Sequence, residues 1–574
     1  MQATAPAPIL RHLELEALET AVRWPNVEPP TVLALTGQLL AVRRFYDGYA
    51  YFLERTQDHP DQPLFVALAG FFQARAGLDL TEAIAHLDRA VSLEPGLPNY
   101  FRGLVLADLP PAFGRAKAAV SDLELVLAVK DRLPLGFMRS ANRALAKVYT
   151  ALGHDEEARA ALERSGPTAG PDEGPILVTD YWVTAEHGFR FVPPRLVELA
   201  PRVYVAQGYD LSDFAFVETD DGIVAIDTGS TESHARAALQ ALRQITTRPI
   251  RHILLTHAHW DHIGGLNALR KAGAQVIAQA SFAQELAIQN SVPLPFRYFL
   301  PADAKQQQHV TPNRLIANPD RLQIGGSEFM LYLVRGGETA DGLMIHLPKR
   351  GVVFTGDVIM PYLGAPFFPE GSAQGLFEAM RLIQDLKPEL LIHGHTGLTE
   401  RFTIQAFPGL ERTLHDLHEL VLDGIGQGRT VVELLHHNHL PVILRDHPAA
   451  VLAYLVIRDN FINRVYHQHT GYWKPDGEGM EQFSPAEWAA ALDLLGGGTE
   501  DAFVRTAQDL HARGDAPLAL KLADVGLVRY PASRPLATLR QQILLRLVER
   551  HQQLNPFKFI AYSSRAGFEL LPAR

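Results

Sequence analysis

The sequence predicts an α/β core between two helical regions, and three observations support this fold class. From residue 176 to about 410, short apolar runs that predict strands alternate with segments that predict helices. Residues 35–165 carry paired helical patterns, and residues 411–574 are again mainly helical. Because 574 residues are too many for one hydrophobic core, we expect three domains, at 1–165, 176–410 and 411–574.

The composition favours a soluble enzyme over a nucleic-acid-binding or membrane protein. Hydrophobic residues make up 47% of the chain and charged residues 20%, which is ordinary for a globular protein. The formal net charge of −11 argues against nucleic acid as a partner. No stretch approaches a membrane span, and the first residues lack the pattern of a secretory signal, so we expect a cytoplasmic location. The absence of cysteine excludes disulfides and thiolate metal ligands.

The N-terminal helical region contains a repeated pattern. Small residues and leucines recur at helical spacing in the segments 82–90, 118–126 and 145–162, and the first two copies begin 36 positions apart. This pattern resembles tetratricopeptide repeats and predicts either a partner-binding groove or a helical brace against the enzyme domain or a dimer mate. With so few copies we favour the brace. The Gly- and Pro-rich residues 165–175 predict a linker.

The most informative stretch of the chain is the run THAHWDHIGG at residues 256–265. It follows a predicted buried strand at 253–255 and places three imidazoles and one carboxylate within six positions: His257, His259, Asp261 and His262. Side chains two apart on an extended segment point the same way, so His257 and His259 can share one ion, and the turn that follows suits a second. Zinc accepts both ligand types. A chance His-rich loop is the alternative, but this spacing is rare at this composition.

Three further ligand candidates each follow an apolar run and a Gly-containing turn. They are Glu338, Asp357 and His395. A lone Asp after Gly is more often a turn residue, and the other two alone would more often be solvated. Together, in this order after the His-rich run, they predict the ligands that complete a two-metal site. His393 lies closer to its strand, and we expect it to be a structural or supporting group.

These motifs in this order resemble the metallo-β-lactamase fold hydrolases over roughly residues 195–410. The resemblance implies an αβ/βα sandwich with a dinuclear site at one sheet edge. It implies that one zinc ion is held by His257, His259 and Glu338, that the other is held by Asp261, His262 and His395, and that Asp357 bridges the two. The run 222–229 resembles the family's early strand and turn, which makes Asp227 a support for the metal loop, although a turn-capping role fits equally. Mn²⁺ or Fe²⁺ would suit the same ligands.

Within that family the chain is similar to the alkylsulfatase branch. Most of the family has His where this chain has Glu338, and a glutamate there is typical of that branch. The run 203–214 resembles the branch's opening motif, and residues 463–473 resemble its dimerisation domain, where an aromatic turn closes over the active site. The resemblance therefore implies a homodimer. One feature departs from it, because the Asn- and Thr-rich run after the second acidic ligand is replaced here by residues 356–366.

Several other residues are candidates for a part in the site. Four could shape or cover the pocket but are more readily explained as domain-interface residues: Tyr209, Tyr472, Trp473 and Arg464. A second histidine group has Glu433 as its only close acid and is interpreted as surface or interface residues: His436, His437 and His439.

The resulting hypothesis is a dinuclear zinc hydrolase that cleaves a small-molecule sulfate ester of an apolar alcohol through a metal-activated water. Asp261 and Asp357 are its expected catalytic residues, and no serine or cysteine nucleophile is needed. The alternative substrates are a phosphoester, a lactone, a lactam and a thioester. A partner-binding scaffold with a structural metal site is the third hypothesis, and seven ligands argue against it because structural zinc sites take four.

Overall fold

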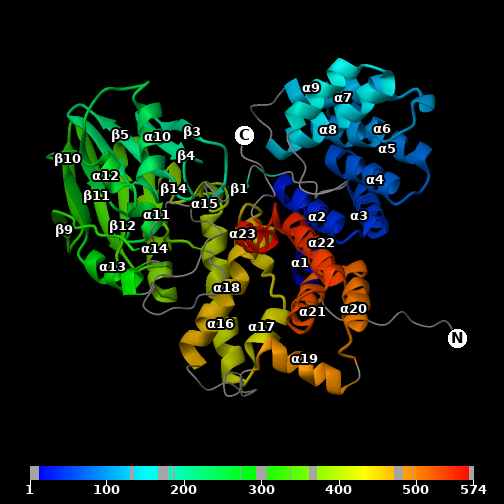
Figure 1. Ribbon diagram of the computed structural model, residues 1–574. Helices are drawn as coiled ribbons and strands as arrows, with labels where there is room; N and C mark the ends of the chain where they lie inside the picture. Colours follow the sequence, from blue (N-terminus) through cyan, green and yellow to red (C-terminus); the bar gives the residue numbers. More distant parts are fainter. Residues whose placement is uncertain are drawn as a thin grey trace. The chain divides into compact units, whose positions relative to one another are not determined.

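The computed structural model (Figure 1) describes most of the chain. The described residues are 12–128, 135–165, 179, 181–184, 188–271, 273–291, 307–335, 338–360, 372–470, 483–495 and 497–567. By internal contacts the chain divides into two compact units. Unit 1 comprises Met1–Asp180 and Glu481–Pro572, and unit 2 comprises Tyr181–Met480.

Unit 1 is helical, as the sequence predicts for both of its segments. Its helices in the N-terminal segment are α1 (Leu13–Ala21), α2 (Pro29–Ala41), α3 (Phe45–Asp58), α4 (Pro63–Arg75), α5 (Leu80–Leu93), α6 (Leu97–Ala107), η1 (Pro111–Phe113), α7 (Ala116–Ala128), α8 (Leu135–Leu152) and α9 (Asp155–Ser165). Those in the C-terminal segment are α19 (Pro485–Leu494), α20 (Glu500–Ala512), α21 (Ala516–Arg529), α22 (Arg534–His551) and α23 (Pro556–Ala566). The helical character of the N-terminal region is confirmed, whereas its kinship with tetratricopeptide repeats stays a prediction.

The two ends of the chain meet inside unit 1. Gln38 on α2 is completely buried and donates to the backbone oxygen of Arg550 on α22 at 2.7 Å. Buried Glu14 on α1 pairs with Arg550 at 3.3 Å and with Lys558 on α23 at 2.6 Å. Buried charges persist where they are paired, so this network fastens the first helices to the last. The helices expected between 411 and 574 therefore fall in both units, and the three-domain division stays a prediction.

Unit 2 is built on two stacked sheets. The seven-stranded sheet has the order β3 (Arg195–Ala200), β4 (Val203–Gln207), β5 (Phe214–Thr219), β6 (Gly222–Ile226), β7 (Ile250–Leu254), β8 (Gln275–Gln279) and β9 (Arg314–Ile316). The five-stranded sheet has the order β10 (Asp320–Ile324), β11 (Ser327–Val334), β12 (Gly342–Leu347), β13 (Val352–Gly356) and β14 (Leu390–His393). Pairing is antiparallel from β3 to β6 and from β10 to β13, and parallel from β6 to β9 and from β13 to β14.

Alternation along the strands explains why the sheets stack with helices outside. On β4, Val203 and Val205 join the core shared with the five-stranded sheet, whereas Tyr204 and Ala206 join a second core with the helices on the other face. Successive strand residues point to opposite faces, so an all-apolar strand is buried on both sides. The helices and short strands around the sheets are β1 (Trp182–Thr184), β2 (Gly188–Arg190), α10 (Glu232–Leu242), α11 (Trp260–Ile263), α12 (Leu266–Leu269), α13 (Phe282–Ser291), η3 (Pro348–Arg350), α14 (Ala373–Leu386) and α15 (Thr396–Thr399). The predicted α/β sandwich is confirmed.

A short helical segment completes unit 2. It consists of α16 (Phe407–Gly426), α17 (Val431–His436), η4 (Val442–Arg445) and α18 (Ala450–Thr470), and α16 packs against both α14 and α18. Among the helices of the described residues, none is both long and apolar enough to cross a membrane.

Candidate metal centre

The seven predicted ligands lie at or just beyond strand ends on one edge of the two stacked sheets. The run that carries His257 follows β7, and Glu338 follows β11. Asp357 follows β13 directly, and His395 lies two residues beyond β14. Because β13 and β14 are parallel neighbours, their carboxyl ends meet at the same edge, which brings Asp357 and His395 together.

Glycines make this convergence possible. A Cβ atom on Gly394 would lie 2.2 Å from Asp357 Oδ1 and 2.6 Å from His262 Cε1, far inside contact distance. A Cβ on Gly356, which has a φ of +55°, would lie 2.7 Å from the Thr256 side chain. Each glycine directly precedes a ligand, so the Gly-Asp and Gly-His motifs provide space as well as a turn.

The seven side chains form three overlapping groups. Within each group, the ligand atoms lie within 4.8 Å of one another. In the first group, Glu338 Oε2 lies 3.3 Å from both His257 Nε2 and His259 Nδ1. In the second, Asp261 Oδ2 lies 3.6 Å from His262 Nε2 and 3.7 Å from His395 Nε2.

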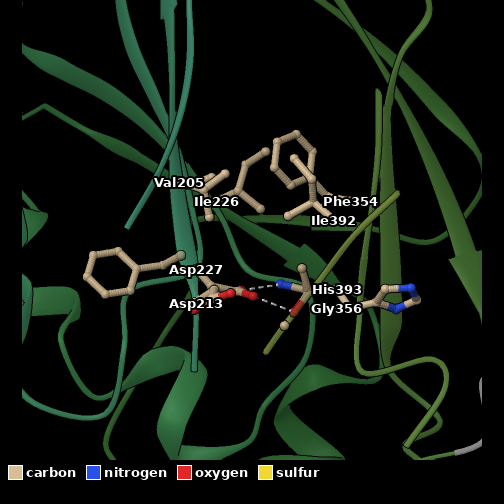
Figure 2. A pocket seen from close by; sticks show the side chains of 12 residues that line it. Val205, Asp213, Ile226, Asp227, Phe354, Gly356, Ile392 and His393 are labelled. Atoms are coloured by element: carbon tan, nitrogen blue, oxygen red, sulfur yellow. Dashed lines mark hydrogen bonds between the residues drawn. The ribbon is translucent and has the colours of Figure 1, made fainter. Parts of the chain in front are cut away.

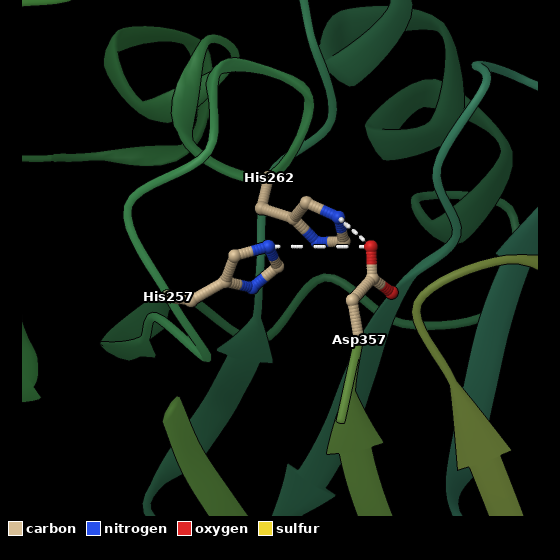
Figure 3. A group of neighbouring side chains, drawn as sticks. All are labelled: His257, His262 and Asp357. Atoms are coloured by element: carbon tan, nitrogen blue, oxygen red, sulfur yellow. Dashed lines mark ion pairs between the residues drawn. The ribbon is translucent and has the colours of Figure 1, made fainter. Parts of the chain in front are cut away.

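Asp357 lies between these two groups. Its Oδ2 is 4.0 Å from His257 Nε2, 3.2 Å from His262 Nε2 and 2.9 Å from His395 Nε2. Figure 3 shows both His257 and His262 directed toward this carboxylate. The structure therefore brings together all seven residues in the grouping that the resemblance implies.

Three of the imidazoles are held by their Nδ1 atoms. His262 Nδ1 donates to Asp227 Oδ2 at 3.0 Å, and His395 Nδ1 donates to the backbone oxygen of Leu211 at 3.0 Å. Thr256 Oγ1 donates to Asp227 Oδ2 at 2.7 Å and accepts from His257 Nδ1 at 3.0 Å. With the proton fixed on Nδ1, each Nε2 presents its lone pair to the centre, as a metal requires.

The donor set passes a test for metal binding that is independent of any motif. Among the described residues, buried side-chain atoms without a hydrogen-bond partner include four from this cluster: His257 Nε2, His262 Nε2, Glu338 Oε2 and Asp357 Oδ1. Leaving a buried polar atom without a partner costs about 1–3 kcal/mol, so a cluster with four such atoms favours a bound partner. Divalent cations satisfy imidazole nitrogens and carboxylate oxygens at the same time.

The electrostatics of the cluster also favour positive charge. Burial would lower the pKa of His395, but Asp357 and Asp261 raise it to about 9. Burial likewise opposes protonation of His262, yet three carboxylates around it raise its pKa well above the usual value. Burial would raise the pKa of Glu338, but His259 and His257 lower it to about 2. A site that attracts protons this strongly attracts metal cations for the same reason.

A small cavity of about 10 Å³ lies between the sheets beside the cluster (Figure 2). Asp213, Asp227 and Thr256 line it from the seven-stranded sheet and its loops, and Gly356 and His393 line it from the five-stranded sheet. This volume has room for about one water molecule and none for an organic substrate.

His393 is a structural residue in this arrangement. Its Nε2 donates to the backbone oxygen of Phe402 at 2.9 Å, and its Nδ1 accepts from Thr355 Oγ1 at 2.8 Å. Burial lowers its pKa to about 4, which keeps the ring neutral. Both nitrogens are occupied, which agrees with the expectation that His393 supports the site.

The remaining candidate residues do not belong to the ligand cluster. Tyr209 is partly buried against the core of the seven-stranded sheet, and Arg464 lies on α18. Tyr472 and Trp473, with the predicted aromatic turn, lie outside the described residues. The group of His436, His437 and His439 forms no ligand cluster in the described part of the chain, and His439 pairs with Asp416 at 2.6 Å.

Two supporting features are not evident from the sequence motifs. The hydroxyl of Thr256 lies between Asp227 and His257. Residues 211–213 contact the His395 turn directly. Their signal in the sequence was a cluster of polar residues between two apolar strands.

Comparison with known proteins agrees with this geometry. Residues 209–395 match the metallo-beta-lactamase superfamily. The chain is similar to the (R)-specific secondary-alkylsulfatase of Pseudomonas sp., with 24% identity over 404 residues that cover 61% of this chain and 59% of the relative. It is also similar to a hydroxyacylglutathione hydrolase of Cereibacter sphaeroides, with 30% identity over 207 residues that cover 34% of this chain and 69% of the relative.

Among solved structures, the fold is similar to a stereoselective inverting sec-alkylsulfatase from Pseudomonas sp. The TM-score is 0.53 at 21% identity, over 66% of this chain and 66% of that one. The chain spans between 53% and 65% of the length of the first three curated relatives that it matches, all of them alkylsulfatases.

Proposed function

Because the chain belongs to the metallo-β-lactamase superfamily, we propose that its seven-residue cluster holds two zinc ions and hydrolyses a sulfate ester of an apolar alcohol. The observation that carries the proposal is the set of four buried ligand-type atoms without a hydrogen-bond partner, on residues that form two groups with Asp357 between them. Seven ligands in two groups match a catalytic pair and exceed the four of a structural zinc site.

The proposed division of labour follows from the distances. His257, His259 and Glu338 would hold one ion and Asp261, His262 and His395 the other, with Asp357 able to reach both. Two bound divalent cations would supply Lewis-acid chemistry, lowering the pKa of a water molecule and offsetting negative charge on the ester oxygens.

The chain itself would orient the reaction. Asp227 and Thr256 fix the rings of His262 and His257, so the ligand geometry is set before substrate binds. Asp357, whose Oδ2 lies between the two groups, would accept a hydrogen bond from the attacking water and hold it in place. Asp261, the other proposed catalytic residue, is positioned 3.6–3.7 Å from two imidazoles of the second group.

The choice of a sulfate ester rests on two supports. Three relatives named as sulfatases match 53% to 61% of this chain, whereas a hydroxyacylglutathione hydrolase of Rhodobacter capsulatus matches 37%. Glu338 also stands close to both His257 and His259, in the position where the sequence resembles the alkylsulfatase branch. The anionic sulfate group of such an ester would be attracted to a cationic metal centre, whereas a neutral ester would gain less from this attraction.

A second candidate is hydrolysis of a thioester. It is favoured by one observation, the 30% identity to a hydroxyacylglutathione hydrolase over 207 residues. The same cluster would serve both reactions, so the leaving group separates the two candidates.

A substrate comparison on zinc-loaded, metal-analysed protein tests the proposal. A medium-chain alkyl sulfate is expected to release inorganic sulfate, and a hydroxyacyl glutathione thioester is expected to be turned over slowly or not at all. Asp357→Ala protein, purified and zinc-loaded in the same way, serves as the control for contaminating activity. Thioester turnover without sulfate release would replace the first candidate by the second, and no turnover of any ester would contradict the proposed hydrolase.

A further inference from the structure

A three-residue segment, Leu211–Asp213, contacts the second ligand group from one side. The segment lies directly before β5 and is buried, with Ser212 completely so. The backbone oxygen of Leu211 accepts a hydrogen bond from His395 Nδ1 at 3.0 Å. The hydroxyl of Ser212 donates to the backbone oxygen of Asp261. The segment therefore contacts two residues of the same proposed metal group.

Asp213 forms hydrogen bonds with both residues that flank His395. Its backbone N–H donates to the oxygen of Gly394 at 2.7 Å, and its carboxylate accepts from Thr396 Oγ1 at 2.7 and 3.0 Å. Gly394 and Thr396 are the residues on either side of His395, so one side chain and one amide hold the ligand from both ends. Asp213 is buried, and this burial raises its pKa to about 7.

The segment is itself anchored to the loop that carries Asp227. Asp210 accepts from the backbone N–H of Leu211 at 2.7 Å and from that of Ser230 at 2.8 Å. His234 Nδ1 lies 2.9 Å from Asp210, and both residues are buried. Asp227, on the same loop as Ser230, orients His262, so the segment and this loop together support all three members of the second group.

The first group is independent of this segment. In the described part of the chain, the hydrogen bonds of Leu211, Ser212 and Asp213 go to Asp210, Asp261, Gly394, His395 and Thr396. His257 is oriented by Thr256, which in turn donates to Asp227. Asp227 therefore supports both groups, since it also orients His262, whereas Leu211–Asp213 contacts the second group only.

We propose that Leu211–Asp213 is a positioning element for one ion of the pair, and that Asp213 and Ser212 set the affinity of the Asp261–His262–His395 group alone. This inference rests on the proposed function, because it requires two ions. Loss of a supporting contact typically weakens a metal ligand site by about 10–100-fold, and here the loss falls on one ion.

The test measures metal retention and the cobalt spectrum in four variants. Asp213→Ala removes the carboxylate, Asp213→Asn keeps an oxygen that can accept from Thr396, and Ser212→Ala removes the hydroxyl bond to Asp261. Asp122→Ala is the matched control, because Asp122 is an equally buried aspartate in unit 1 that accepts from Asn99 and Arg102. Each protein is loaded with Co²⁺ and dialysed against graded chelator, and bound metal and visible absorption are recorded.

Wild type, Asp213→Asn and Asp122→Ala are expected to keep two ions per chain. Asp213→Ala is expected to lose one ion at chelator concentrations about 10–100-fold lower than wild type requires, and to lose the absorption bands of that ion as well. The other ion is expected to be retained. Equal release of both ions from wild type and Asp213→Ala would overturn the positioning role. If Asp213→Ala does not fold, Ser212→Ala decides by the same measurement, and unchanged release there overturns it. A wild-type protein with fewer than two ions would instead contradict the proposed two-metal function.

Discussion

The substitution Gly394→Ala tests whether the space before His395 sets the site. The added methyl group would lie 2.2 Å from Asp357 Oδ1, where ordinary contact begins at 3.4 Å, so one of the two must move by about 1.2 Å. The neighbouring His262 Cε1, at 2.6 Å, would have to move by about 0.8 Å. Both side chains are buried, which leaves little room for this movement.

Such a displacement exceeds what a metal site tolerates. Ligand distances are fixed to within about 0.2 Å, and a misplacement of about 1 Å costs on the order of 100-fold in rate. We therefore expect Gly394→Ala to lose at least about 100-fold in esterase activity and to retain less than two ions. Overpacking is expected to lower the free energy of unfolding by about 1–3 kcal/mol.

The assay compares metal content, turnover and urea unfolding with those of a matched glycine substitution. Gly426→Ala is suited to this purpose, because Gly426 is exposed at the end of α16 and its added Cβ would meet no atom within 4 Å. This control is expected to keep its activity and to gain up to about 1 kcal/mol of stability. Wild-type metal content and turnover in Gly394→Ala would refute the reasoning.

Three further predictions follow from the structure. Asp357→Ala is expected to abolish turnover and to weaken metal retention by more than about 100-fold, because Asp357 reaches both groups; near-normal activity would show that the bridge is misplaced. Burial lowers the pKa of His551 to about 3. Between pH 6.5 and 3, His551 is therefore protonated in the unfolded chain but neutral in the folded protein. Wild type should therefore lose stability relative to His551→Gln on acidification through that range, by up to about 1.4 kcal/mol per pH unit, and parallel urea-unfolding curves would contradict this. The homodimer inferred from residues 463–473 predicts a sedimentation mass near twice the chain's 63.4 kDa, and a value near 63.4 kDa at micromolar concentration would count against it.

The metal cluster was predictable from the sequence because its signals are local. His257, His259, Asp261 and His262 stand in one short run, and each later ligand directly follows a glycine after an apolar strand. Strand alternation and turn chemistry act over a few residues, so they are visible without knowledge of the fold. The resemblance to a known family then supplied the expectation that these residues meet at one sheet edge.

The supports of the cluster were not predictable in the same way. Asp213 and Thr396 are 183 positions apart, and nothing local to either residue indicates the other. Gln38 and Arg550, 512 positions apart, likewise place the last helices with the first ones, although the sequence suggested a separate C-terminal domain. Contacts of this kind depend on which elements pack together, which hydrophobic periodicity alone does not determine.

The central claim, that seven side chains hold a pair of divalent cations, is tested most directly by anomalous diffraction at the zinc edge from crystals of the zinc-loaded protein. Two peaks are expected about 3.5–4 Å apart. One should be bounded by His257, His259 and Glu338, the other by Asp261, His262 and His395, with Asp357 between them. A single peak, or peaks outside this cluster, would contradict the account.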